Sequence, residues 1–286
     1  MLDSRLFNPE DEKLIYHYCD AKTFLEICTN HTIRSCDVFS MNDFLEMHWG
    51  YSIWEDVATS LIEELGHEFI DKIDEIFHTC GTKNLLLASC FSLNGDSLSQ
   101  WRSYSDDGRG FAIGFRVKDI IELPVRLLKV LYNREKQINE LKEIIRVIYA
   151  SEQLEVNKYS DIFKDKCHKL ALDFVSFKNP AFIEEEEIRM VHLVDIEKSN
   201  SFFKLKDSEG IYFGQKAIEK PIEFLMKGSL PVAFIDYNFT NHDEINPIKE
   251  VYLGPKNDSL PSAISVFLET NNLGNVRILK SKASYR

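Results

Sequence analysis

The segment from Cys90 to Phe115, CFSLNGDSLSQWRSYSDDGRGFAIGF, holds the densest group of side chains that could bind a ligand. Trp101 and Tyr104 are three residues apart, a spacing that puts both rings on one face of a helical turn, beside Arg102. Flat rings next to charged donors suit a planar ligand. The structural alternative is that both rings only anchor a short helix to a sheet.

A second group of candidate side chains is the acidic run near residue 185. Glu185, Glu187 and Arg189 alternate along the chain, so in an extended strand they project from one face. Two carboxylates and a guanidinium could orient ribose hydroxyls or stabilise positive charge on a sugar carbon. The alternative is a solvated acidic edge strand in which the arginine pairs locally.

The third group lies near the start of the chain. Tyr16 and His17 sit in the short aromatic strand LIYHY, and Asn42 and Asp43 follow the next predicted strand. Together they could form two walls of a pocket. A single histidine on a strand is, however, more often a packed or exposed residue than a ligand-binding one.

Several standard signatures are absent. The chain has no GxxxxGK[ST], no GxGxxG after a strand, no GxSxG and no HExxH. Its six cysteines form no CxxC pair, so neither a zinc site nor any other metal site is expected. Common kinase, dehydrogenase and hydrolase functions therefore lose support.

The composition of the chain disfavours some classes of binding partner. The 286 residues carry 46 acidic and 34 basic side chains, a net charge of -12, which disfavours nonspecific binding to nucleic acid. No apolar run approaches the roughly 20 residues that cross a bilayer, and the first residues show no apolar signal core. We therefore expect no membrane association, a cytoplasmic location, and a small nucleotide or a protein as partner.

The elements that must position these side chains are predicted from periodicity and turn residues. Asp20 is a predicted N-cap, and Gly66 is expected to divide a helical stretch over residues 54–77. Predicted strands cover 14–18, 32–39, 84–92, 110–115, 125–132, 182–194, 208–213, 230–236, 248–253 and 275–279, and predicted helices cover 21–29, 136–177 and 259–271. The expected fold class is α+β, a mainly antiparallel sheet with attached helices, forming one domain over residues 1–286 with a long helical insertion at about 133–178.

In combination these motifs resemble a known family. The opening LIYHY, the string SMNDFLE, CFS followed by W-x-x-Y and G-F-x-I-x-F, the late E-x-E-x-R and the endings EVYLGPK and ILKSKASYR resemble the bacterial domain of unknown function 2971 family. The family pattern commonly has a basic residue in place of His17, a proline in place of Phe44 and a tryptophan in place of Phe182. The resemblance implies no reaction. It points to candidate site positions at Tyr16, Asn42, Asp43, Glu46, Trp101, Tyr104, Gly110, Glu185, Glu187 and Arg189.

A second resemblance, at the level of motifs, is to ADP-ribosyltransferases, which hold NAD with an early histidine or arginine, a central serine or tyrosine and a late glutamate. It implies that NAD is a co-substrate, that His17 binds a ribose hydroxyl, and that Glu187, beside Glu185, stabilises the charge that forms as nicotinamide leaves. Trp101 or Tyr104 would then stack on nicotinamide, and Arg189 would orient Glu187 or a phosphate.

Two other classes of function use the same residues. One is a non-catalytic module for ligand sensing or protein interaction, which agrees with the lack of a complete catalytic signature; the family resemblance suggests for it a role in bacterial stress or phage defence. The other is a metal-dependent nuclease, which the acidic charge and the missing Asp/Glu-x-Lys pattern disfavour.

Overall fold

The computed structural model describes residues 5–9, 13–40, 45–79, 81, 83–207, 211–212, 214–216, 219–240 and 246–285. Two predicted site residues, Asn42 and Asp43, lie outside these ranges. None of the described helices combines the length and the apolar composition that a bilayer crossing requires.

The described chain begins with a strand–helix–strand unit, and most of its long helices precede the run of strands over residues 187–253. The helices are α2 (Ala21–Asn30), α3 (Leu45–Leu65), α4 (His67–Thr79), α5 (Leu98–Tyr104), α6 (Val117–Ile120), α7 (Arg134–Gln153), α8 (Asp161–Leu172) and α9 (Pro261–Thr270), with 3₁₀ turns η1 (Val38–Ser40), η3 (Asp173–Ser176) and η4 (Pro180–Glu185). The strands are β1 (Leu14–Cys19), β2 (Thr32–Asp37), β3 (Asn84–Ser92), β4 (Phe111–Arg116), β5 (Arg126–Lys129), β6 (Glu187–Lys198), β7 (Phe203–Asp207), β8 (Ile211–Tyr212), β9 (Gln215–Lys216), β10 (Glu223–Lys227), β11 (Leu230–Asn238), β12 (Ile248–Leu253) and β13 (Arg277–Lys280).

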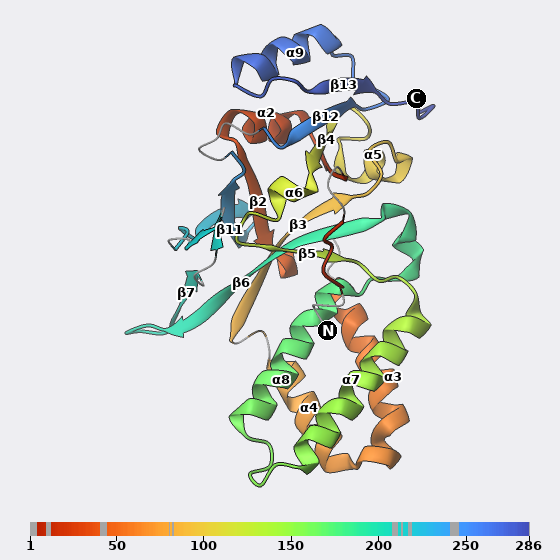
Figure 1. The fold of residues 1–286 in the computed structure, drawn as a ribbon, viewed down its shortest axis with the longest axis vertical. Coiled ribbons are helices and arrows are strands. Elements are labelled where there is room, and N and C mark those ends of the chain that lie inside the picture. Colours follow the sequence, from red (N-terminus) through yellow and green to blue (C-terminus); the bar gives the residue numbers. More distant parts are fainter. Residues whose placement is uncertain are drawn as a thin grey trace.

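The centre of the fold is an open, mostly antiparallel sheet, which confirms the predicted α+β class. Within the described residues its main path runs β10-β11-β2-β3-β1-β4-β12-β13. Strand β6 pairs along the whole of β3, and β5 and β7 pair with β6 (Figure 1). Strand β3 therefore joins the two parts of the sheet.

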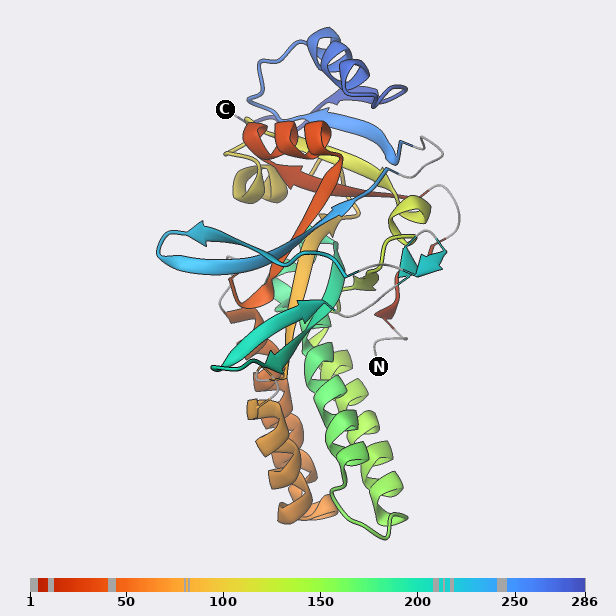
Figure 2. The ribbon, with the colours of Figure 1, turned by 90° about the vertical axis from the view of Figure 1, so that its left-hand side faces the viewer.

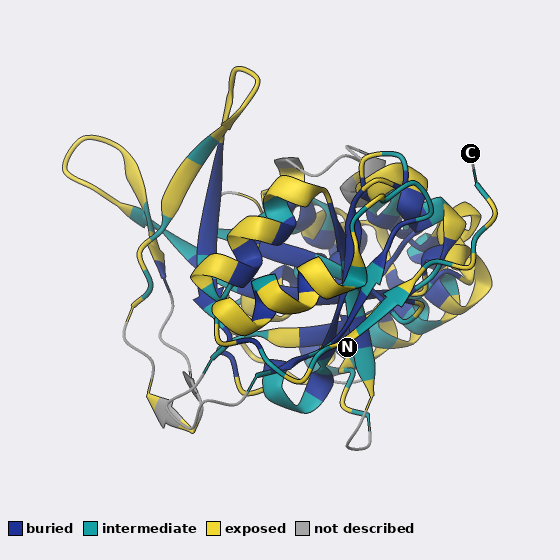
Figure 3. Ribbon diagram, turned by 90° about the horizontal axis from the view of Figure 1, so that it is seen from above, coloured by how far each residue is buried: buried dark blue, intermediate teal, exposed yellow. Residues whose placement is uncertain are grey.

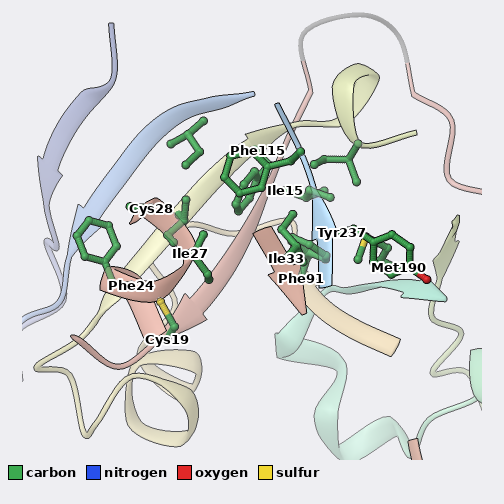
Figure 4. Packing of buried hydrophobic residues seen from close by; sticks show 14 of the residues in the cluster. Ile15, Cys19, Phe24, Ile27, Cys28, Ile33, Phe91, Phe115, Met190 and Tyr237 are labelled. Atoms are coloured by element: carbon green, nitrogen blue, oxygen red, sulfur yellow. The ribbon is translucent and has the colours of Figure 1, made fainter. Parts of the chain in front are cut away.

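One face of the sheet carries the main hydrophobic core. Helix α2 contributes Phe24 and Ile27 to a cluster that also contains Ile15 of β1 (Figure 4). Helix α9 contributes Leu268 to the same cluster. The rings of Phe24 and Phe111 stack with centroids 4.0 Å apart. Asp20 caps α2 as predicted, because its Oδ1 accepts a hydrogen bond from the Thr23 amide at 2.7 Å.

The second core lies in a bundle made of α3, α4, α7 and α8, which extends from the sheet (Figures 1 and 2). Trp54 packs edge-on against Phe77, and its Nε1 donates to Asp74 at 2.8 Å. Helices α7 and α8 cover much of the predicted helical insertion, but their apolar faces are buried against helices from the earlier segment 45–79. Gly66 divides α3 from α4 as predicted, with φ at +87°.

The strand predictions differ from the structure in the second half of the chain. The strand expected from Phe182 begins only at Glu187, because η4 precedes it and Glu186 takes a left-handed conformation with φ at 44°. Strands β7 and β10 were not predicted, since neither has buried apolar residues in alternation. The predicted strand at 208–213 lies mostly outside the described residues, which show β8 at its end.

Gly110 provides a test of the packing around β4. A Cβ at this position would lie 2.1 Å from the backbone oxygen of Cys19, so the Gly110→Ala variant must displace β1 or β4. We expect a loss of about 3 kcal/mol in the free energy of unfolding, measured by urea denaturation. Gly66→Ala is the control: it meets no atom within 4 Å, so only its positive φ costs stability, about 1 kcal/mol. An equal loss in the two variants would contradict this account.

Candidate functional site

Four charged side chains form a buried group on the face of the sheet opposite the main core. We call Lys178, Glu185, Glu187 and Arg189 the charge cluster. Their exposed fractions are 4%, 7%, 4% and 1%. Two cations and two carboxylates balance one another, as buried charges require.

The backbone brings these residues together in two ways. Glu187 and Arg189 alternate at the start of β6, so they share a face as predicted. Glu185 reaches the same group by a different route, because it ends η4 and the left-handed Glu186 turns the chain between them. Lys178 directly precedes Asn179, whose side chain caps η4 by accepting from the amide of Ala181 at 2.9 Å.

The contacts within the charge cluster are short and specific. Arg189 donates to both carboxylate oxygens of Glu187, from Nε at 2.7 Å and from Nη2 at 3.0 Å. Lys178 Nζ bridges the two glutamates, 2.9 Å from Glu187 Oε2 and 2.5 Å from Glu185 Oε2. The Nη1 of Arg189 donates to the carbonyl oxygen of Val175 in η3 at 2.7 Å. The cluster therefore connects β6 with η3 and η4.

The two glutamates differ in their electrostatics. Burial disfavours the charged form of Glu187, but attraction to Arg189 and Lys178 outweighs it and lowers the pKa to about 2. Burial raises the pKa of Glu185, and the attraction of Lys178 only partly offsets this, while Glu187 adds repulsion. Glu187 is therefore the firmly ionised member, and Glu185 carries a charge that its surroundings disfavour.

Aromatic side chains stand where the charge cluster meets solvent. Tyr104, at the end of α5, donates from its hydroxyl to Glu185 Oε1 at 3.1 Å, and its side chain is 39% exposed. The ring of Phe182 is 37% exposed and has Lys178 Nζ 5.1 Å from its centroid. Burial raises the pKa of Tyr104, and the nearby carboxylate of Glu185 adds to this, so the phenol keeps its proton.

Sequence reasoning missed two members of this site. Tyr132 accepts a hydrogen bond from the amide of Glu187 at 2.9 Å, and Lys178 bridges the glutamates. Neither belongs to a recognisable motif. The only signal in the sequence is charge compensation: an acidic run that is buried must find cations nearby, and Lys178 is the closest lysine on its N-terminal side.

The structure does not bring His17 to the charge cluster. Tyr16 pairs with Ser92, and Ser92 pairs with Glu187, so these three side chains share a face of the sheet. His17, the next residue after Tyr16, points to the opposite face. There its Nδ1 lies 3.0 Å from the carbonyl oxygen of Cys90 and its ring lies against Phe91.

Tyr16 is on the correct face but is held away from the charge cluster. Its hydroxyl donates to Glu250 Oε2 at 2.8 Å, on the far side of β4. The ring crosses Gly114, where a Cβ would lie 2.8 Å from Tyr16 Cε1. Glu250 also pairs with Arg277, so Tyr16 belongs to a second polar group.

Trp101 anchors α5 to the sheet, which is the alternative to ligand binding that the sequence left open for it. It is 0% exposed, its Nε1 donates to Asp96 at 2.8 Å, and its ring packs edge-on against Tyr18. It fixes α5 on the sheet and thereby positions Tyr104 over Glu185. Among the described residues, no group of three or more His, Cys, Asp and Glu side chains could hold a metal ion.

The shifted pKa of Glu187 predicts how stability depends on pH. Its pKa is lowered from 4.5 to about 2 in the folded state, so its contribution is complete above about pH 4.5 and is lost as pH falls toward 2. The raised pKa of Glu185 acts in the opposite sense and favours the folded state as pH falls. We expect Glu187→Gln to be less stable at neutral pH but to lose less stability on acidification. Urea denaturation at a series of pH values measures this, and parallel curves for the two proteins would contradict it.

Comparison with known proteins gives one match. Residues 100–190 match the model of a family described as a protein of unknown function, DUF2971. No curated protein and no solved structure matches the chain. The matched segment contains Tyr104, Tyr132 and all four residues of the charge cluster. The resemblance to this family predicted from the sequence is thereby confirmed over residues 100–190.

Proposed function

We propose that the chain is an ADP-ribosyltransferase-like enzyme that uses NAD, with Glu185 as the carboxylate that faces the substrate. The observation that carries this proposal is the position of Glu185 at the boundary of the charge cluster. One of its oxygens accepts from Lys178 at 2.5 Å, and the other accepts from the hydroxyl of Tyr104, whose side chain is partly exposed.

Glu185 suits this role better than Glu187. Glu187 accepts three hydrogen bonds, two from Arg189 and one from Lys178, whereas Glu185 accepts one at each oxygen, so Glu185 has more acceptor capacity left for a substrate hydroxyl. A small rotation of Tyr104 would expose Oε1 of Glu185. The role first expected for Glu187 thus passes to Glu185, and Glu187 becomes a residue that positions Lys178 and Arg189.

The chemistry follows from the charges. When the bond between nicotinamide and ribose breaks, the nicotinamide leaves with the electron pair and the sugar carbon becomes positively charged. A nucleophilic atom of the acceptor then bonds to that carbon and gives up its proton. A carboxylate that is disfavoured by burial interacts strongly with such a charge, and can also accept a hydrogen bond from a ribose hydroxyl. Tyr104 and Phe182 offer exposed rings for the flat nicotinamide or adenine. In this mechanism His17 has no role, because it faces the other side of the sheet.

A second function, a ligand-sensing module without catalysis, is favoured by one observation. Every carboxylate oxygen in the charge cluster already accepts a hydrogen bond, and the two positive and two negative charges balance. Such a network, with its hydrogen bonds already satisfied, could form a rigid surface against which a ligand binds. In that case Tyr104 and Phe182 would bind the ligand and no bond would break.

The Glu185→Gln variant tests the catalytic proposal. It keeps the shape of the side chain and removes the charge, so NAD should still bind while release of nicotinamide falls by roughly 10²-fold or more. Calorimetry with NAD and with adenosine diphosphate ribose measures binding, and chromatography of the reaction mixture measures nicotinamide. The Tyr104→Phe variant, which only uncovers Oε1, is the matched control and should retain turnover. Equal turnover in Glu185→Gln and the parent protein would remove Glu185 from the mechanism.

Ligand binding without turnover would favour the sensing function, and it too has a test. Tyr104→Ala and Phe182→Ala should each weaken binding of adenosine diphosphate ribose by roughly tenfold, because each removes an exposed ring. Phe202→Ala is the control, since that ring is 76% exposed at the distant tip of the β6–β7 hairpin. If neither ligand binds to the parent protein at millimolar concentration, both nucleotide-based functions fail.

A further inference from the structure

The hairpin of β10 and β11 projects from the body of the molecule and ends the main path of the sheet (Figures 2 and 3). Its turn consists of Gly228 and Ser229, with φ of Gly228 at 61°, and Lys227 pairs with Leu230 on either side of it. Along the described part of the chain no strand pairs with the outer edge of β10. An open edge of this kind is a template for pairing with another strand.

The turn determines which backbone groups face outward. A two-residue turn is closed by a hydrogen bond between its flanking residues, so Lys227 directs its backbone groups toward β11. Because antiparallel pairs alternate, Leu225 and Glu223 do the same. Phe224 and Met226 are left to present their amide and carbonyl groups at the outer edge.

The sequence of β10 is self-complementary when a second copy is reversed against it. In an antiparallel pair centred on Leu225, Phe224 of each copy lies opposite Met226 of the other, and these are the residues with outward backbone groups. Glu223 of each copy then lies opposite Lys227 of the other. A two-fold axis through Leu225 therefore gives two ion pairs and a continuous set of backbone hydrogen bonds.

The exposed apolar side chains agree with the same register. Phe224 and Met226 are 61% and 64% exposed, and they alternate onto one face of the strand. In the reversed pair four such side chains would form one apolar group across the axis. The opposite face would hold the two Leu225 side chains between the two ion pairs. Charges of one sign on an edge strand prevent pairing, whereas one charge of each sign at symmetric positions selects a reversed copy.

We propose that two copies of this chain form a symmetric dimer by antiparallel pairing of their β10 strands, which joins the two sheets into one. The occupant of the edge is a second copy because the charges and the apolar residues of β10 complement themselves in this register and in no parallel one. The dimer is independent of the chemistry at Glu185, which ends η4 next to the start of β6, a strand that does not pair with β10.

Sedimentation velocity over a wide range of protein concentrations tests the proposal. The parent protein should pass from monomer to dimer, and Glu223→Lys and Lys227→Glu should each raise the dissociation constant by roughly tenfold or more, because each puts two like-charge pairs across the axis. The double variant Glu223→Lys/Lys227→Glu exchanges the charges and should return to within roughly threefold of the parent. Lys204→Glu, the same change on the edge strand β7, is the matched control and should have no effect.

Cross-linking provides a second measurement that does not depend on charge. In the proposed register Leu225 faces its own copy in a pair without backbone hydrogen bonds, where Cα atoms are about 4.5 Å apart, within disulfide range. Under mild oxidation Leu225→Cys should give a covalent dimer, whereas the parent protein, with its own cysteines, should not. A parent protein that stays monomeric at the highest concentration, or charge-reversal variants that associate as the parent does, would overturn the proposal. Single variants that weaken association without recovery in the double variant would overturn the register in which Glu223 lies opposite Lys227.

Discussion

The structure depends on how it neutralises one fully buried arginine. Arg189 is 1% exposed and lies between the sheet and the helical bundle, where an unpaired charge would cost several kcal/mol. Glu187 supplies both of its oxygens, and η3 supplies a backbone carbonyl. Because these partners come from β6 and from the end of the α8 segment, the arginine fixes the orientation of the bundle relative to the sheet.

The rest of the charge cluster extends that constraint toward solvent. Lys178 adds a second positive charge beside Glu187 and also donates a hydrogen bond to Glu185. Glu185 in turn accepts a hydrogen bond from Tyr104 of α5. Buried charges usually cost stability relative to apolar residues of similar size, so a cluster of four is better suited to specificity or function than to stability alone. Exposure rises from 1% at Arg189 to 7% at Glu185 and 39% at Tyr104, so Glu185 is the carboxylate that lies next to the exposed ring.

Local features of the fold could be predicted from the sequence, and long-range pairings could not. The N-cap at Asp20, the break at Gly66 and the alternation of Glu187 with Arg189 are properties of a few adjacent residues. The exclusion of His17 from the site depends on the register of β1 against β3, in which Tyr16 pairs with Ser92. A shift of one residue would have reversed the two faces, and no local pattern specifies that shift.

The same difference between local features and long-range contacts explains which residues of the candidate site could be predicted. Glu185 and Glu187 were predicted to share one strand face, yet they meet because a left-handed Glu186 turns the chain between η4 and β6. Trp101 was expected either to bind a ligand or to act as an anchor, and its hydrogen bond to Asp96 and complete burial make it the anchor. Lys178 and Tyr132 had no motif to reveal them, because what selects them is proximity to a buried carboxylate.

The division of the helical bundle between two chain segments has a consequence for biosynthesis. Helices α3 and α4 are complete at Thr79, but the helices that cover their apolar faces do not begin until Arg134. Translation proceeds at about 5–20 residues per second, so α7 and α8 are synthesised several seconds after α3 and α4. During that time Val57, Leu61 and Ile73 are not covered by α7 and α8. Over that interval the nascent chain presents a surface of the kind that molecular chaperones bind, and that favours aggregation when synthesis outpaces them.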